Sequence, residues 1–197
     1  MAQIEDGSGS SYLAKVDSKK RLYTKSVSIG ENLEATKTGD SFNINTGVIT
    51  LTDSVDTPVA YLKNNETKSL HIVAIAIGLG PSTGGSGGIP KVTVIRNPTT
   101  GTIISSTPTA VDISSNRNYG SAKALDSVLA YKGATGDTMT DGDDHLIIFQ
   151  SAGSRLFATI DELLPTGSSI GVKVDPQPSN TSMDVYCAFI CHLEEAE

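Results

Sequence analysis

The residues best suited to chemistry stand near the end of the chain, where "VYCAFICHL" contains Cys187, Cys191 and His192. Thiolates and imidazoles bind transition metals, and cysteine pairs form disulfides. On a strand, Cys187 and Cys191 share one face but lie about 13 Å apart at ~3.3 Å per residue, beyond disulfide reach. His192 points to the other face. The spacing therefore predicts two buried thiols in a core strand, with a metal site or a cysteine pair across subunits as alternatives.

A second candidate is Ser82 in "GPSTG", residues 80–84, which fits the G-x-S-x-G pattern of hydrolase nucleophiles. That nucleophile needs a helix directly after the serine. The glycine-rich "GGSGGIP" that follows does not favour one. For the same reason the neighbouring "GLG" is not predicted to bind a phosphate at a helix N-terminus. We therefore predict no nucleophilic serine here.

Acidic residues gather in "GDTMTDGDDH", residues 136–145, which contains Asp137, Asp141, Asp143, Asp144 and His145. Carboxylates at such spacing bind calcium in some loops, but the glutamate that closes an EF-hand loop is missing. The sequence favours an acidic turn that accepts hydrogen bonds from its own backbone, with a surface calcium site as the alternative. The remaining histidine, His71, is predicted to pack in an apolar strand. Because no catalytic constellation emerges, we predict no enzyme activity, no metal requirement and no cofactor.

The composition of this chain of 197 residues argues against nucleic acids and membranes as its partners. Its net charge of -7 argues against nucleic-acid binding, which needs a basic surface. No stretch reaches the ~18 apolar residues of a membrane span, and the acidic start "MAQIEDGSGS" is unlike a signal peptide. With two cysteines, the chain is expected to fold in a reducing cytoplasm without a disulfide framework.

The elements that must position these residues are short strands. Nineteen glycines and many Thr, Ser and Val favour strands and tight turns. We predict hairpins in residues 41–52, 58–78, 91–106 and 154–176, one helical turn within 29–40, and either a helix or a strand in 122–133. About ten strands with turns every ~8–12 residues predict an all-β fold, an antiparallel β-sandwich or a barrel. Residues 1–14 are predicted to form a flexible N-terminal arm and 15–197 the β-domain.

Two predicted strands, "LHIVAIAIG" and "VYCAFICHL", are apolar on both faces. A strand covered on one side alternates, as Ile170, Val172 and Val174 do with their polar neighbours. The second apolar face then needs a cover, either the arm, another subunit or the protein's own interior. We predict that it mediates self-association through the residues of one face of each strand, namely Ile72, Ala74, Tyr186, Ala188 and Ile190.

Most of the chain resembles virion proteins of tailed bacteriophages. The resemblance begins in "IEDGSGSSYLAKVDSKKRLYTKSV", which is similar to a lead-in that precedes a β-domain in many of them. It continues in "NTGVITLTDSVDTPVAYLKNNE", "VTVIRNPTTGTI", "SSNRNYGS" and "LPTGSSIGVKVDPQPSNTSMDVYCAFICHL". The resemblance implies a structural protein of the jelly-roll type, most similar to head decoration (cement) proteins, which sit as trimers on the capsid.

This resemblance implies a function and a set of partners. The protein would decorate the outer surface of the phage head, after assembly in the host bacterial cytoplasm, by binding the major capsid protein and itself as a homotrimer. An extended arm spans up to ~35 Å, enough to reach a neighbouring capsomer. We expect the docking residues to be Ile4, Tyr12, Leu13, Lys15, Lys19, Lys20 and Arg21. The alternative is a tail or fibre component with a receptor- or carbohydrate-binding sandwich, although six tyrosines and no tryptophan give it little aromatic surface.

Overall fold

The structure is a computed structural model that describes residues 30–194 apart from 53–54, 82, 84–87, 107, 114 and 178–181. The predicted arm and Ser82 lie outside the described residues. So do all seven predicted docking residues, Ile4, Tyr12, Leu13, Lys15, Lys19, Lys20 and Arg21.

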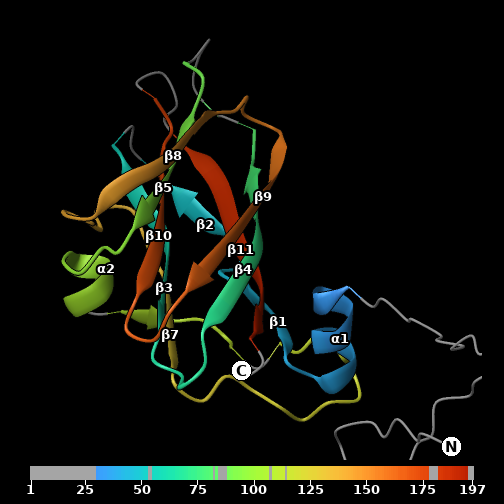
Figure 1. Ribbon diagram of the computed structural model, residues 1–197. Coiled ribbons are helices and arrows are strands. Elements are labelled where there is room, and N and C mark those ends of the chain that lie inside the picture. Colours follow the sequence, from blue (N-terminus) through green and yellow to red (C-terminus); the bar gives the residue numbers. More distant parts are fainter. Residues whose placement is uncertain are drawn as a thin grey trace, which may run out of the picture. The chain divides into compact units, whose positions relative to one another are not determined.

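The described residues form two short helices and eleven strands (Figure 1). The helices are α1 (Glu31–Thr38) and α2 (Thr102–Ser105). The strands are β1 (Ser41–Asn45), β2 (Ile49–Leu51), β3 (Thr57–Asn64), β4 (Leu70–Leu79), β5 (Lys91–Arg96), β6 (Thr109–Ala110), β7 (Val128–Lys132), β8 (Asp143–Phe149), β9 (Arg155–Leu164), β10 (Ser169–Asp175) and β11 (Met183–Leu193). The prediction of a mostly β chain is confirmed, and the helical turn predicted within 29–40 is α1.

Two antiparallel sheets pack face to face as a sandwich. Sheet I has the order β1-β11-β4-β9, with β2 also pairing with β11, and sheet II has the order β6-β7-β3-β10-β5-β8. Without the short β2, β6 and β7, the remaining strands, numbered along the chain, run 1-8-3-6 in sheet I and 2-7-4-5 in sheet II. This interleaving is jelly-roll-like. It places the last strand, β11, in the middle of sheet I.

The predicted hairpins are wrong as strand pairs, although the chain does turn where expected. β3 and β4 belong to different sheets, and so do β9 and β10, so the turns at Asn64 and Pro165 lead from one sheet to the other. β1 and β2 do not pair with each other; they lie one after the other along β11. Residues 102–105 form α2 instead of a returning strand. A turn signal shows that the chain reverses but not which sheet receives the next strand.

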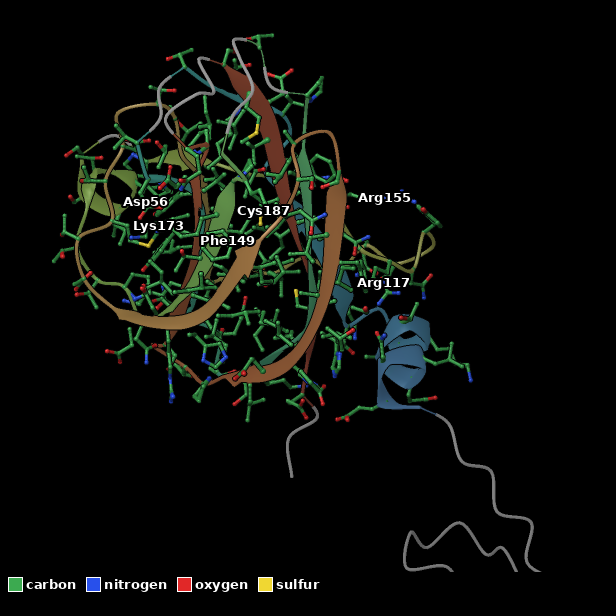
Figure 2. The ribbon with its side chains drawn as sticks, turned by 90° about the horizontal axis from the view of Figure 1, so that it is seen from above. Asp56, Arg117, Phe149, Arg155, Lys173 and Cys187 are labelled. Carbon is green, nitrogen blue, oxygen red and sulfur yellow. The ribbon has the colours of Figure 1, made fainter. Side chains whose placement is uncertain are left out.

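The sandwich interior is filled by alternate residues of both sheets. Ile170, Val172 and Val174 of β10 face the interior, as predicted, opposite Phe42 and Phe189 of sheet I. These side chains are branched or aromatic and suit strands that bury one face. Lys173 points away from the interior and forms an ion pair with Asp56 at 2.9 Å (Figure 2).

β4 is apolar on both faces for a local reason. The ladder with β11 shifts register between Ile190 and Cys191, opposite Ile72 and Ala74, so Val73 is an extra residue that forms a bulge. A bulge reverses the alternation, and Leu70 and Ile72 before it face the same interior as Ile75 and Ile77 after it. The assignment of Ile72 to an outer, self-associating face is therefore wrong, because its side chain lies in the core.

The outer face of sheet II has its own cover. Ile103 of α2 and Met139 from the acidic segment pack with Tyr61 and Ile95 in a second, smaller hydrophobic cluster. Tyr61 stacks on Tyr131 with ring centroids 5.8 Å apart. Residues 122–133, for which the sequence allowed a helix or a strand, end in the strand β7.

One edge of sheet I is also covered. The segment around Asn116 pairs with β1, and the Arg117 guanidinium donates hydrogen bonds to Asn32 (2.8 Å) and to the Ser41 hydroxyl (3.2 Å). Figure 2 shows Arg117 on this side of the sandwich. At the opposite side, β9 ends sheet I and β8 ends sheet II, and neither has a second strand partner among the described residues.

Candidate functional site: an outer sheet face and a histidine–carboxylate cluster

The two cysteines are core residues. Cys187, which is labelled in Figure 2, and Cys191 are unpaired thiols, and both are fully buried in the sandwich core. Burial raises the pKa of both thiols, that of Cys191 to about 12, because the low-dielectric interior disfavours the thiolate. The prediction of buried thiols is confirmed. Their burial leaves neither available for a disulfide across subunits.

The acidic segment uses carboxylates to hold loops together. Asp141 accepts hydrogen bonds from the backbone N–H groups of Thr99 (2.9 Å) and Thr100 (2.8 Å), and from the Thr99 hydroxyl. These donors lower the pKa of Asp141 to about 2. Asp137 accepts from the Thr102 hydroxyl at 2.9 Å. The prediction that these carboxylates accept hydrogen bonds is confirmed, but Asp141 and Asp137 accept them mainly from the loop after β5 and from α2. Asp143, Asp144 and His145 do not belong to a turn, because they lie in the strand β8.

The outer face of sheet I has no hydrophobic cluster packed on it among the described residues, unlike the outer face of sheet II. Three rows of side chains cross it from β11 through β4 to β9, and together they define what is called here the outer face: Tyr186–Gly78–Arg155, Ala188–Ala76–Phe157 and Ile190–Ala74–Thr159. Four of the five residues predicted for self-association, all but Ile72, lie in these rows.

The outer face has small side chains at its centre and one charged residue in its three rows. Alanines occupy its middle, and the ring of Tyr186 lies over Gly78, where a Cβ would collide with it. Phe157 is 62% exposed at the β9 end. Arg155 is the one charged side chain in the three rows. No sequence signal marks Phe157 as an exposed residue, because the "RLFATI" strand alternates in the normal way and does not show which side faces solvent.

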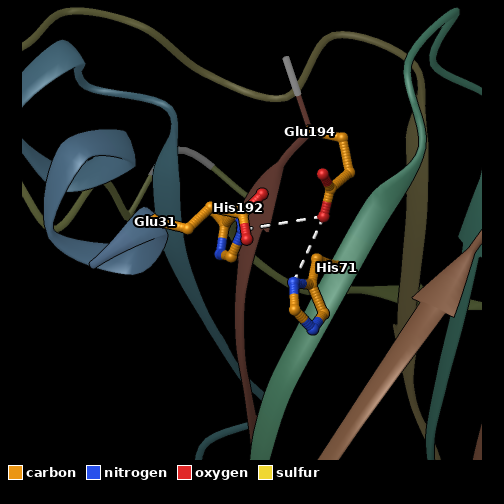
Figure 3. Close-up of side chains that lie close together, drawn as sticks. All are labelled: Glu31, His71, His192 and Glu194. Atoms are coloured by element: carbon orange, nitrogen blue, oxygen red, sulfur yellow. Dashed lines mark ion pairs between the residues drawn. The ribbon is translucent and has the colours of Figure 1, made fainter. Parts of the chain in front are cut away.

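A polar cluster continues this face toward the end of β11. His71 of β4 is the cross-strand partner of His192 of β11, and their rings meet edge to face with centroids 4.7 Å apart. The carboxylate oxygen Oε1 of Glu194 lies 3.2 Å from Nδ1 of His71 and 3.8 Å from Nε2 of His192 (Figure 3). On its other side, Nε2 of His71 lies 2.7 Å from Oδ1 of Asp161 on β9.

No sequence signal marks this cluster. The sequence predicts His71 as a packing residue and relates His192 only to the cysteines. The structure separates His192 from Cys191, which faces the core, and brings it to His71 across the sheet. His71 and His192 are far apart in the sequence, and only the register between β4 and β11 makes them neighbours.

Comparison with known proteins adds no relative. No protein-family model and no curated protein matches the chain. Among the described residues, no helix has the length and apolar character needed to span a membrane.

Proposed function

We propose that this protein is a bacteriophage virion structural protein that decorates the head by binding the major capsid protein and further copies of itself. The observation that carries the proposal is the outer face of sheet I, on which the described residues pack no hydrophobic cluster and whose three rows hold one charged side chain. Two further features support it: the jelly-roll-like strand order, and the resemblance of most of the sequence to tailed-phage virion proteins.

The distribution of charge favours the outer face as the surface for self-association. A chain with a net charge of -7 repels other copies of itself over most of its surface. The three rows of the outer face carry no carboxylate, and the small side chains of Ala76 and Ala188 at their centre allow another subunit to approach closely. The proposed assembly is a trimer, in which each copy must contact its neighbours through two different patches. The partner of the outer face is therefore a neighbouring part of sheet I in another copy.

Capsid attachment is assigned to the N-terminal segment. Residues 1–14 offer no core-forming pattern, and Lys15, Lys19, Lys20, Arg21 and Lys25 follow them directly. Five of the fifteen basic residues of the chain are concentrated there. In an acidic protein, such a cluster suits docking on an acidic shell surface.

The location on the virion can be tested by imaging. Purified virions are labelled with an antibody against this protein and viewed by negative-stain electron microscopy. Label distributed over the head supports decoration, whereas label confined to the tail replaces it with the tail or fibre alternative.

A second experiment tests the N-terminal segment. Protein that lacks residues 1–14 is added to heads that lack the native protein; the truncated chain should remain folded and fail to bind. Binding equal to that of the full chain would remove the arm from the docking mechanism.

A further inference from the structure

We propose that His71, His192 and Glu194 form a binding site for a divalent transition-metal ion such as Zn²⁺. His71 comes from β4, His192 from the end of the adjacent strand β11, and Glu194 from the residue that follows β11; their ligand atoms lie within 4.8 Å of one another (Figure 3). An ion with bonds of about 2.0–2.1 Å to nitrogen and oxygen holds tetrahedral ligands about 3.3 Å apart. The distances of 3.2 and 3.8 Å to Glu194 Oε1 bracket that value.

The contact with Asp161 determines which nitrogen of a neutral His71 ring faces Glu194. Its Nε2 lies 2.7 Å from the Asp161 carboxylate, which accepts a hydrogen bond, so Nε2 carries the proton. In the neutral ring, Nδ1 then presents a lone pair. This Nδ1 is buried and makes no hydrogen bond among the described residues, although Glu194 Oε1 is 3.2 Å away. A metal ion bound between this lone pair and the Glu194 oxygen would be ligated by both atoms.

A second bulge places Asp161 where its carboxylate can orient the His71 ring. On β9, Thr159 and Glu162 oppose Ala74 and Ile72, so β9 has one residue more than β4 in this stretch. Asp161 occupies the bulge with φ +53°, in the left-handed region that non-glycine residues rarely adopt. The Asp161–His71 pair has the form of the carboxylate–histidine contact that orients histidine ligands of metals.

The donor set selects the class of ion. Two imidazole nitrogens and one carboxylate oxygen suit zinc and its first-row neighbours, whereas calcium and magnesium prefer oxygen ligands. Three protein ligands leave a fourth position for water or a group from a partner. A bound ion would join the end of β11 to β4, next to the outer face proposed for self-association. The site does not depend on that proposed function.

The test uses the full chain after EDTA treatment and dialysis, titrated with ZnCl₂ by calorimetry. One ion per chain with a rise in melting temperature is expected, and Co²⁺ should give a visible d–d spectrum typical of nitrogen–oxygen ligation. His71→Asn and Glu194→Gln should each abolish saturable binding, and Asp161→Asn should weaken it about 10–100-fold at unchanged stoichiometry.

His145→Asn is the matched control, because His145 instead pairs with Glu162 at 2.8 Å. It should bind zinc like the native chain. Absence of saturable binding, or binding that survives both His71→Asn and Glu194→Gln, would overturn the proposal. Circular dichroism confirms that each variant is folded. Head decoration can fail in the virion experiment while zinc still binds, so the two outcomes are independent.

Discussion

Ile72 and Ala74 lie two residues apart on β4, yet their side chains point to opposite faces of sheet I. Ile72 belongs to the sandwich core, whereas Ala74, which is also fully buried, lies in the outer row with Ile190 and Thr159. The bulge at Val73 causes the change. The double apolarity of "LHIVAIAIG" thus arises from a change of face within one strand and does not by itself require another subunit.

The bulge makes Ile72 and Val73 differ in their contribution to stability. Ile72→Ala should lower the free energy of unfolding by about 2–5 kcal/mol, because it opens a cavity in the core. Val73→Ala should cost about 1 kcal/mol or less, since Val73 is only half-buried. Urea denaturation measures both. A strand without the bulge would place Val73 with Ile75 in the core, so a larger loss for Val73→Ala than for Ile72→Ala would contradict the register described.

The sequence predicted which segments form strands, and which of their faces are buried, better than it predicted how the strands pair. The alternation of Ile170, Val172 and Val174 marked a strand with one buried face, and the spacing of Cys187 and Cys191 marked one face of another. Pairing is a long-range property: β1 and β11 are neighbours from opposite ends of the fold. The bulge at Val73 and the approach of His71 to His192 depend on that pairing, and neither has a local signal.

Asp141 should make stability depend on pH in the acid range. Its pKa in the folded protein is about 2, below the ordinary value of 3.8, so it contributes stability above pH 3.8 that is lost as the pH falls toward 2. Asp141→Asn should therefore lower the urea midpoint at pH 7, and the difference from the native chain should shrink between pH 4 and 2. Asp144→Asn removes the same charge from an exposed position and is the control. Equal effects of the two variants at pH 7 would assign the change to net charge.

Gly101 is required by the close approach of two loops. It has φ +140°, and an added Cβ would collide with the Thr138 carbonyl oxygen and lie 2.8 Å from Met139 Cα. Gly101→Ala should cost about 2–4 kcal/mol, because strain and collision add and Met139 is displaced from the cluster over sheet II.

Gly136→Ala separates these two causes. Gly136 has φ +91° but open space around its Cβ position, so only backbone strain of about 1 kcal/mol is expected. Thermal unfolding of both variants measures the difference. Equal losses of stability in the two variants would show that a methyl group at position 101 does not collide with Thr138.

The proposed self-association leads to a prediction for the centre of the outer face. Ala188 is half-buried between Asn45 of β1 and Ala76 of β4. A lysine there can extend its charged end into water in an isolated chain, but three such charges cannot be buried in a trimer without partners. Ala188→Lys should therefore convert a trimer into a monomer in sedimentation velocity at micromolar concentration, while the circular dichroism spectrum stays unchanged.

Ile147→Lys provides the matched control for this experiment. Ile147 is 49% exposed on the edge strand β8 of sheet II, so the substitution adds the same charge to an apolar surface position outside the outer face. It should leave the trimer intact. Dissociation by Ile147→Lys but not by Ala188→Lys would move the interface to the β8 edge, where the backbone of an edge strand is available for pairing. A native chain that sediments as a monomer would remove self-association and leave the outer face as solvent-exposed surface.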